Sequence, residues 1–152
     1  MSDNGRPILA LAFLLVVIFV CAIYIPPLFK PPVPTMEVTS CALASSTMQN
    51  NGITSISFSV KNNDANNAHN LTVQFSSYQT VSFMLGSQPL SQQNGQWVYT
   101  DALYPSSQLT QSINVQPSLA YGVNSLTYNV YVTFYMDGNQ FCSKTLVLNV
   151  KS

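Results

Sequence analysis

Charged side chains are scarce in this chain of 152 residues, and their scarcity argues against one large class of function. Lys, Arg, Asp and Glu together make up 7% of the residues, whereas typical globular domains carry about a quarter. Residues 31–152 hold three lysines and four acids, a formal charge of 3 − 4 = −1. Nucleic-acid binding depends on clustered Lys and Arg, so we expect no nucleic-acid partner.

Catalytic and metal-binding motifs are missing as well. The chain has one histidine, His69, and three cysteines, whereas zinc and copper sites need several such ligands at compatible spacing. The acids Glu37, Asp64, Asp101 and Asp137 lie in or beside expected turns, where Asp is favoured for backbone reasons, and show no paired arrangement for acid–base chemistry. We therefore expect no enzymatic activity, no metal and no cofactor. We interpret His69 as a structural hydrogen-bonding residue.

What the chain does have is one long apolar run near its N-terminus. Residues 8–25 are 18 residues without a charge, an amide side chain, Gly or Pro, about 27 Å of helix against the roughly 30 Å of a bilayer core. A cleaved secretory signal has a shorter apolar core and a small-residue cleavage site. The run predicts an uncleaved transmembrane helix over residues 8–29, after a short cytoplasmic segment 1–7 and before a proline-rich spacer at 30–35.

Two further features favour an extracellular location for the C-terminal part. The triplet NLT beginning at Asn70 is an N-glycosylation acceptor pattern. Cys41 and Cys142 are a natural pair for a disulfide in an oxidising compartment, although two reduced thiols in a cytosolic domain are the alternative. Cys21 follows Val20 rather than the small residue of a lipoprotein signal, so we expect it to be free in the membrane. The predicted localisation is a cell membrane, crossed once.

In residues 36–152 apolar and polar residues alternate with the period of two that is typical of strands. The clearest run is 125–136, with others at 55–60, 69–75, 80–85 and 144–150 and weaker ones at 96–100 and 108–115. Asp137-Gly138 predicts a hairpin turn. This pattern predicts one all-β domain over 36–152, an immunoglobulin-like antiparallel sandwich of seven or eight strands. The residues expected to face the core are Ile56, Phe58, Val60, Leu71, Val73, Phe75, Val81, Phe83, Leu85, Leu126, Tyr128, Val130, Val132, Phe134, Met136, Leu146, Leu148 and Val150.

The same alternation places the two cysteines of the domain. Cys142 shares its parity with Leu146, so it is expected to face inward. Cys41 is out of phase with Val38, so it faces inward only if a bulge or a strand end lies near Ser40. A bridge between the two would then join the first and last strands.

The stretch "ISFSVKNNDANNAHNLTVQF", residues 56–75, resembles the strand–loop–strand core of CARDB or fibronectin-III-like sandwich modules of archaeal envelopes. The layout of the chain is similar to archaeal envelope accessory proteins such as the stator-like accessory component of the archaellum. It is also similar to small anchored subunits of membrane oxidoreductases and to membrane proteins of archaeal virions. The resemblance, together with the low charge, implies an archaeal origin, in a cell envelope or a virion.

Two functions follow from these observations. The first is an anchored structural or interaction protein that binds a surface layer, filament, capsid or neighbouring copy. Its expected contact surface is Tyr131, Thr133 and Tyr135, on the polar face of the longest strand, because Tyr is common at interfaces; the alternative is that these rings only cover the sheet. The second function is a small non-catalytic subunit that holds a larger membrane oxidoreductase, with alanines of the apolar run as helix contacts.

Overall fold

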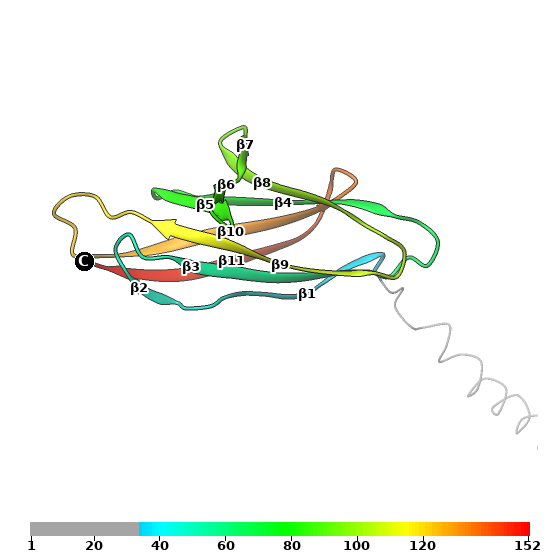
Figure 1. Cartoon of the computed structure of the whole chain (residues 1–152), viewed down its shortest axis with the longest axis horizontal. Coiled ribbons are helices and arrows are strands. Elements are labelled where there is room, and N and C mark those ends of the chain that lie inside the picture. Colours follow the sequence, from blue (N-terminus) through cyan, green and yellow to red (C-terminus); the bar gives the residue numbers. More distant parts are fainter. Residues whose placement is uncertain (1–33) are drawn as a thin grey trace, which may run out of the picture. The chain divides into compact units, whose positions relative to one another are not determined.

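The computed structural model describes residues 34–152, and Pro34–Ser152 forms a compact unit of two stacked β-sheets (Figure 1). The predicted segments 1–7 and 8–29, and the spacer up to residue 33, lie outside the described residues, as does Cys21. No helix within residues 34–152 has the length and apolar character needed to cross a bilayer. The predicted all-β class and two-sheet architecture are confirmed.

The two sheets contain eleven strands in all. Sheet A has the order β1 (Met36–Leu43), β3 (Thr54–Asn62), β9 (Gln108–Pro117), β5 (Val81–Leu85) and β6 (Gln88–Pro89). Sheet B has the order β2 (Thr47–Gln49), β11 (Asn139–Lys151), β10 (Ser125–Met136), β4 (His69–Ser77), β8 (Gln96–Leu103) and β7 (Ser91–Gln93). Neighbouring strands are antiparallel except β2 and β11, which are parallel.

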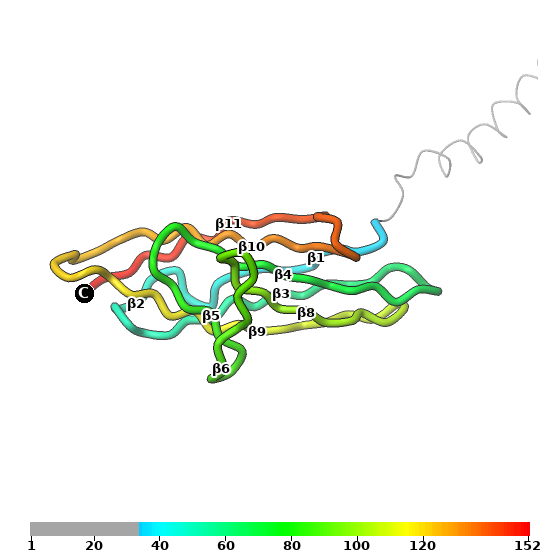
Figure 2. The backbone as a smooth tube through the Cα atoms, turned by 90° about the horizontal axis from the view of Figure 1, so that it is seen from above, coloured from blue at the N-terminus to red at the C-terminus, as the bar shows by residue number. Residues whose placement is uncertain are grey.

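The expectation of seven or eight purely antiparallel strands was therefore too simple. The additional strands β2, β6 and β7 are three, two and three residues long, too short to show a period of two. Two of them belong to a segment that stands out from the body of the sandwich (Figures 1 and 2). There the chain passes from sheet A at β6 to sheet B at β7, and the buried side chain of Leu90 lies between them.

The core lies between the sheets and is built around aromatic rings. The ring of Phe58, from β3, lies 5.7 Å from that of Phe134 and 5.9 Å from that of Tyr99, centroid to centroid and edge to face. Edge-to-face rings at this separation are favoured beyond their apolar burial. Most residues predicted to face inward are buried, but Leu85 and Leu126 are 41% and 39% exposed. Both lie at the end of a strand, where the facing sheet no longer covers them.

Of the two possibilities near Ser40, a bulge or a strand end, the structure has the bulge. The register between β1 and β3 shifts between Val38 and Ser40, and the shift sets Cys41 opposite the buried Phe58. At the other predicted turn, Asp137 and Gly138 both have positive φ, 49° and 83°, the geometry of a two-residue hairpin loop. The predicted hairpin turn is confirmed.

Candidate functional site

The outer face of sheet B carries the three residues predicted to form a contact surface. Tyr131, Thr133 and Tyr135 point away from the core on β10. The residues that alternate with them, Val130, Val132 and Phe134, are fully buried. The three outward residues are half-buried. Their partners on β4 are Ser76, Gln74 and Thr72, in that order. Residues four apart on one strand lie about 13 Å apart, so Tyr131 and Tyr135 are separate points on this face.

The structure pairs Tyr131 with a residue that the sequence pattern did not single out. Tyr78, directly after β4, places its ring edge to face on that of Tyr131, with the centroids 5.7 Å apart. Tyr78 is 90% exposed. The two rings, with Ser76, Ser77 and Gln96, line a hollow of about 280 Å³. We call these five residues the tyrosine pocket.

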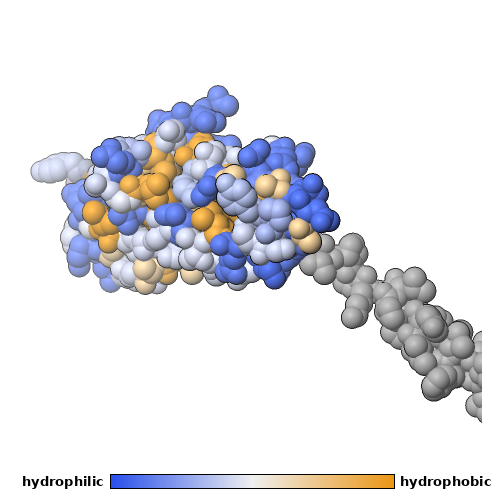
Figure 3. Space-filling model, turned by 45° about the vertical axis from the view of Figure 1, so that its right-hand side comes forward, coloured by the Kyte–Doolittle hydropathy of each residue, from blue (hydrophilic) through white to orange (hydrophobic). Residues whose placement is uncertain are grey.

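The face around the tyrosine pocket is polar but uncharged. Four strands of sheet B form this face: β4, β8, β10, and β11 as far as Asn149. None of their outward positions carries an acidic or basic side chain. These positions are Asn70, Thr72, Gln74, Ser76, Gln96, Val98, Thr100, Ala102, Thr127, Asn129, Tyr131, Thr133, Tyr135, Ser143, Thr145, Val147 and Asn149. Figure 3 shows one side of the domain, on which pale areas lie among blue and orange ones. Such a face offers hydrogen-bonding groups and apolar area to a partner but no charged side chains.

The outer face of sheet A is also uncharged along much of its length, but its hydroxyls bond to one another. Ser59 Oγ lies 2.7 Å from Thr110 Oγ1, and Ser57 Oγ donates to Ser112 Oγ at 3.4 Å. These side chains are short, so the strands present a flat surface. We call them the serine ladder.

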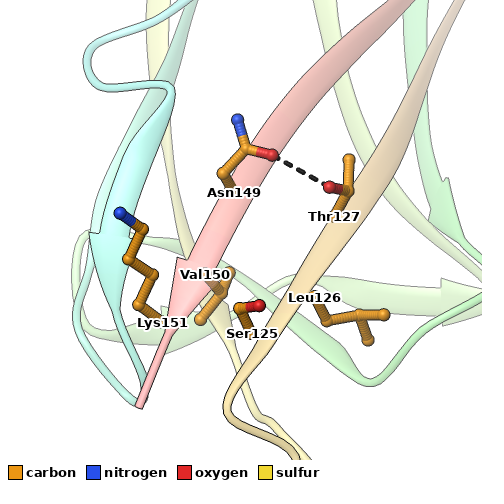
Figure 4. A pocket seen from close by; sticks show the side chains of 6 residues that line it. All are labelled: Ser125, Leu126, Thr127, Asn149, Val150 and Lys151. Carbon is orange, nitrogen blue, oxygen red and sulfur yellow. Dashed lines mark hydrogen bonds between the residues drawn. The ribbon is translucent and has the colours of Figure 1, made fainter.

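A second hollow lies where β10 begins and β11 ends (Figure 4). Its volume is about 460 Å³, and three cross-strand pairs line it: Ser125 with Lys151, Leu126 with Val150, and Thr127 with Asn149. Thr127 Oγ1 donates to Asn149 Oδ1 at 2.9 Å, and Figure 4 shows this bond between the two strands. The hollow is open, and Lys151 is its one charged residue.

A polar cluster lies where the β3–β4 loop meets the β10–β11 turn. His69, at the start of β4, lies between two carboxylates: its Nδ1 is 2.7 Å from Asp137 Oδ2 and its Nε2 is 3.4 Å from Asp64 Oδ2. Asp64 belongs to the β3–β4 loop and Asp137 to the β10–β11 turn. From the sequence these acids were expected to be scattered and unpaired, but the fold brings them to one histidine. The interpretation of His69 as a hydrogen-bonding residue agrees with its contacts.

The contacts of this cluster shift the pKa of each member. The hydrogen bond to Asp137 is the main reason that the pKa of His69 is raised. Hydrogen bonds from the side chain of Asn67 and the backbone N–H of Asn66 hold the pKa of Asp64 well below its usual range. The hydrogen bond from His69 lowers the pKa of Asp137. A protonated His69 between two ionised carboxylates is therefore the favoured state in mildly acidic solution.

A buried amide fixes the loop that carries Asp64. Asn62 is fully buried at the end of β3, and its Nδ2 lies 2.9, 3.2 and 3.1 Å from the carbonyl oxygens of Asn67, Leu103 and Tyr104, which share its two N–H groups. Its Oδ1 accepts from the backbone N–H of Asp64 at 2.9 Å. Both ends of this amide are directed at loop backbone, so Asn62 holds the loop in place.

Cys41 and Cys142 lie on strands β1 and β11 and are free thiols in the structure. Cys41 is opposite Phe58 in sheet A and Cys142 is opposite Phe134 in sheet B, and these two rings are in contact. Both cysteines therefore face the interior, near each other. Burial raises the pKa of Cys41 to about 11, and the negative charge of a Cys142 thiolate adds to this effect.

Asn70 has the accessibility that an acceptor for a sugar requires. It is exposed on the outer face of sheet B, and its backbone bonds to Asp137 through both the N–H and the carbonyl. Its amide therefore extends from a well-fixed strand. In residues 34–152 no three His, Cys, Asp or Glu side chains are arranged to hold a metal ion.

Comparison with known proteins gives no family for this chain. No protein-family model and no curated protein matches its sequence. Among solved structures, an alkylpurine DNA glycosylase, AlkC of Pseudomonas fluorescens, bound to DNA containing an abasic site analog is similar to 78% of this chain, with a TM-score of 0.49 and 8% identity; the chain covers 31% of that protein. The ASH/PapD-like domain 7 of human CEP192 is similar over 83% of this chain and 90% of that one, with a TM-score of 0.35 and 11% identity. Both TM-scores are below 0.5, so neither likeness bears on function.

Proposed function

We propose that this chain is a single-pass membrane protein whose extracellular, immunoglobulin-like domain binds a partner through the outer face of sheet B, without catalysis. The partner belongs to a cell envelope, a surface filament or a virion, and a neighbouring copy is one such partner. The observation that carries the proposal is the tyrosine pocket on an uncharged face. Exposed aromatic rings beside hydroxyl and amide groups are typical of contact surfaces, which favour Tyr and disfavour charged residues at their centre.

The membrane anchor in this proposal rests on the apolar run at 8–29, and the extracellular location on Asn70 and the cysteine pair. The resemblance of residues 56–75 to CARDB or fibronectin-III-like modules supports an archaeal envelope. Those residues correspond to β3, the following loop and β4. The scarcity of charge in this domain also suits a surface that works outside the cell.

Site-specific photo-crosslinking in native membranes tests the proposal. A photoreactive residue at Thr133 lies on the outer face of sheet B, and one at Ser112 lies on the serine ladder of sheet A. We expect a crosslinked partner from Thr133 and none from Ser112. Equal yields from both positions, or none from Thr133, would contradict the assignment to sheet B. A catalytic oxidoreductase subunit crosslinked at Thr133 would instead favour the small-subunit function.

A further inference from the structure

We propose that the tyrosine pocket is a binding site for a neutral sugar residue of a glycosylated partner. The inference rests on the proposed function and names the chemistry that its contact surface recognises. Four features carry it: the position of the pocket within sheet B, its size, its lack of charge, and the pairing of two aromatic rings with hydroxyl and amide groups.

The position of the pocket excludes recognition by strand addition. β4 and β10 are inner strands of sheet B, with β8 and β11 on their other sides. Tyr131 is paired on both sides, with Ser76 of β4 and Thr145 of β11, and the β4–β8 ladder ends at the Phe75–Trp97 pair, so only Ser76 and Ser77 lack a ladder partner on the β8 side. A peptide that adds as a strand needs a free sheet edge, so a ligand here is held by side chains alone.

The size of the pocket fits a single ring rather than a helix or a loop. Pockets for drug-sized molecules have volumes of about 300–1,000 Å³, and this one measures about 280 Å³. Its walls rise from three strands or their ends, because Ser76 and Ser77 belong to β4, Gln96 to β8 and Tyr131 to β10. The rigid sheet fixes their spacing before a ligand arrives.

The chemistry of the pocket matches a neutral pyranose. A sugar ring presents aliphatic C–H groups on one face, and these carry partial positive charge that is attracted to the negative face of an aromatic ring. Tyr78 is 90% exposed and offers such a face. Gln96 supplies two N–H donors and an acceptor, and each serine and tyrosine hydroxyl both donates and accepts. Ser77 Oγ donates to Gln79 Oε1 at 2.8 Å and accepts from the Gln79 N–H at 3.3 Å, which leaves one lone pair for a sugar hydroxyl.

The absence of charge on the lining residues selects among sugars. No acid or base lines the pocket, so an acidic sugar such as a uronate would lose hydration without gaining a counter-charge. A neutral hexose loses only hydroxyl–water bonds that the pocket can replace. The pocket should therefore prefer neutral to acidic sugars of the same ring size.

Titration of the full-length protein in a detergent without sugar groups tests the inference. Maltoside detergents are avoided because their headgroups would compete. The probes are the methyl glycosides of glucose, galactose and mannose, with methyl glucuronide as the acidic comparison, and amide NMR shifts are the readout. We expect at least one neutral glycoside to shift the amides of Ser76, Ser77 and Gln96 saturably, and the glucuronide to bind at least tenfold more weakly.

Two variants sharpen the test. Tyr78→Ala should weaken binding of that glycoside at least tenfold, whereas Tyr121→Ala, at a fully exposed tyrosine outside the pocket, should leave binding unchanged. Because Tyr78 is so exposed, its loss is not expected to unfold the domain, and the amide spectrum checks this. No saturable shift at the pocket with any neutral glycoside, or equal weakening by both variants, would overturn the inference. If those titrations fail while Thr133 still crosslinks a partner, the proposed function stands and only the sugar is rejected.

Discussion

The outer faces of the two sheets are built from similar residues but differ in what their polar groups do. On sheet A, the hydroxyls of the serine ladder bond to each other, as Ser59 does to Thr110 at 2.7 Å. On sheet B, tyrosine rings stand above the strands and leave a hollow between Tyr78 and Tyr131. The comparison teaches that low charge alone does not make a binding surface. A face becomes available to a partner when its hydrogen-bonding groups are not already used by their neighbours.

The largest expected effect comes from a change that would remove both faces at once. Phe58 belongs to sheet A, but its ring lies against Phe75, Tyr99 and Phe134 of sheet B. Phe58→Ala should lower the free energy of unfolding by about 3–5 kcal/mol, because it leaves a cavity between the sheets. The single tryptophan, Trp97, packs against this core, so its fluorescence during urea unfolding reports on the domain.

The matched control for Phe58→Ala is Tyr121→Ala, at a fully exposed ring, which should change the unfolding midpoint little. A loss below about 1 kcal/mol for Phe58→Ala would mean that the two sheets do not depend on a shared core.

The next effect concerns a disulfide between the first and last long strands, β1 and β11. We expect Cys41 and Cys142 to be bonded in protein from an oxidising compartment, joining β1 of sheet A to β11 of sheet B, and Cys21 to be free. Reduction should then cost about 2–4 kcal/mol of stability. Alkylation of the denatured chain before and after reduction checks the pairing by mass. One labelled thiol before reduction and three after are expected.

Cys41→Ala serves as the control, because it should make Cys142 react with the alkylating reagent without prior reduction. Three labelled thiols in the unreduced natural chain, trapped during isolation, would reject the bridge. Because the pKa of Cys41 is raised to about 11, bond formation in purified reduced protein should be faster in alkaline solution, where more thiolate is present.

A smaller effect, on partner binding, compares the outer face of sheet B with that of sheet A. Tyr131→Ser with Tyr135→Ser should weaken partner binding by about 1–2 kcal/mol while leaving stability close to that of the natural chain, since both side chains point outward. Ser57→Ala with Ser112→Ala, on the serine ladder, should leave partner binding unchanged. Because the tyrosine pocket includes Tyr131 and not Tyr135, the single change Tyr131→Ser should account for most of the loss. Unaltered co-purification of the partner with the folded double variant would contradict this assignment.

The smallest expected effect is a pH dependence located at the cluster of His69, Asp64 and Asp137. The lowered pKa values of Asp64 and Asp137 stabilise the fold above about pH 4, and that contribution is lost as acid protonates them. The raised pKa of His69 stabilises the fold below about pH 6.5, and that contribution is lost as rising pH removes its proton. Stability should therefore be greatest between about pH 4 and 6.5.

Urea midpoints from pH 3 to 9 measure this profile, again by Trp97 fluorescence. Asp137→Asn should flatten it, whereas Glu37→Gln, at an exposed acid of β1, should not. An identical profile for Asp137→Asn and the natural chain would show that the cluster does not control it.

The alternation of the sequence predicted most of the core, because inward and outward positions along a strand are a local property, but it left out Ile113 and Val115 of β9, which are fully buried. It also showed that Cys41 and Val38 could both face inward only if a bulge or a strand end lay near Ser40, and the structure has the bulge. It was wrong at Leu85 and Leu126 because periodicity does not say where the opposing sheet ends. The parallel strand β2 was missed because three residues carry no period.

The groups at the candidate site escaped prediction for a different reason. Tyr78 meets Tyr131 only because β4 and β10 pair in one register, and His69 meets Asp137 across 68 residues of sequence. Strand order and register between distant segments are set by the whole fold. A sequence pattern can therefore predict that a tyrosine faces outward, but not which ring it contacts.

The position of the chain ends has a mechanical consequence. Met36 begins β1 at one end of the sandwich and Ser152 lies at the other (Figure 1). A pull on residues 34 and 152 in opposite directions runs along β1 and β11, whereas the hydrogen bonds of their antiparallel ladders to β3 and β10 run across it. Each terminal strand is then loaded in shear, with all its ladder bonds sharing the force, rather than unzipped one bond at a time. The ladders of both terminal strands should therefore resist a pull along the length of the domain.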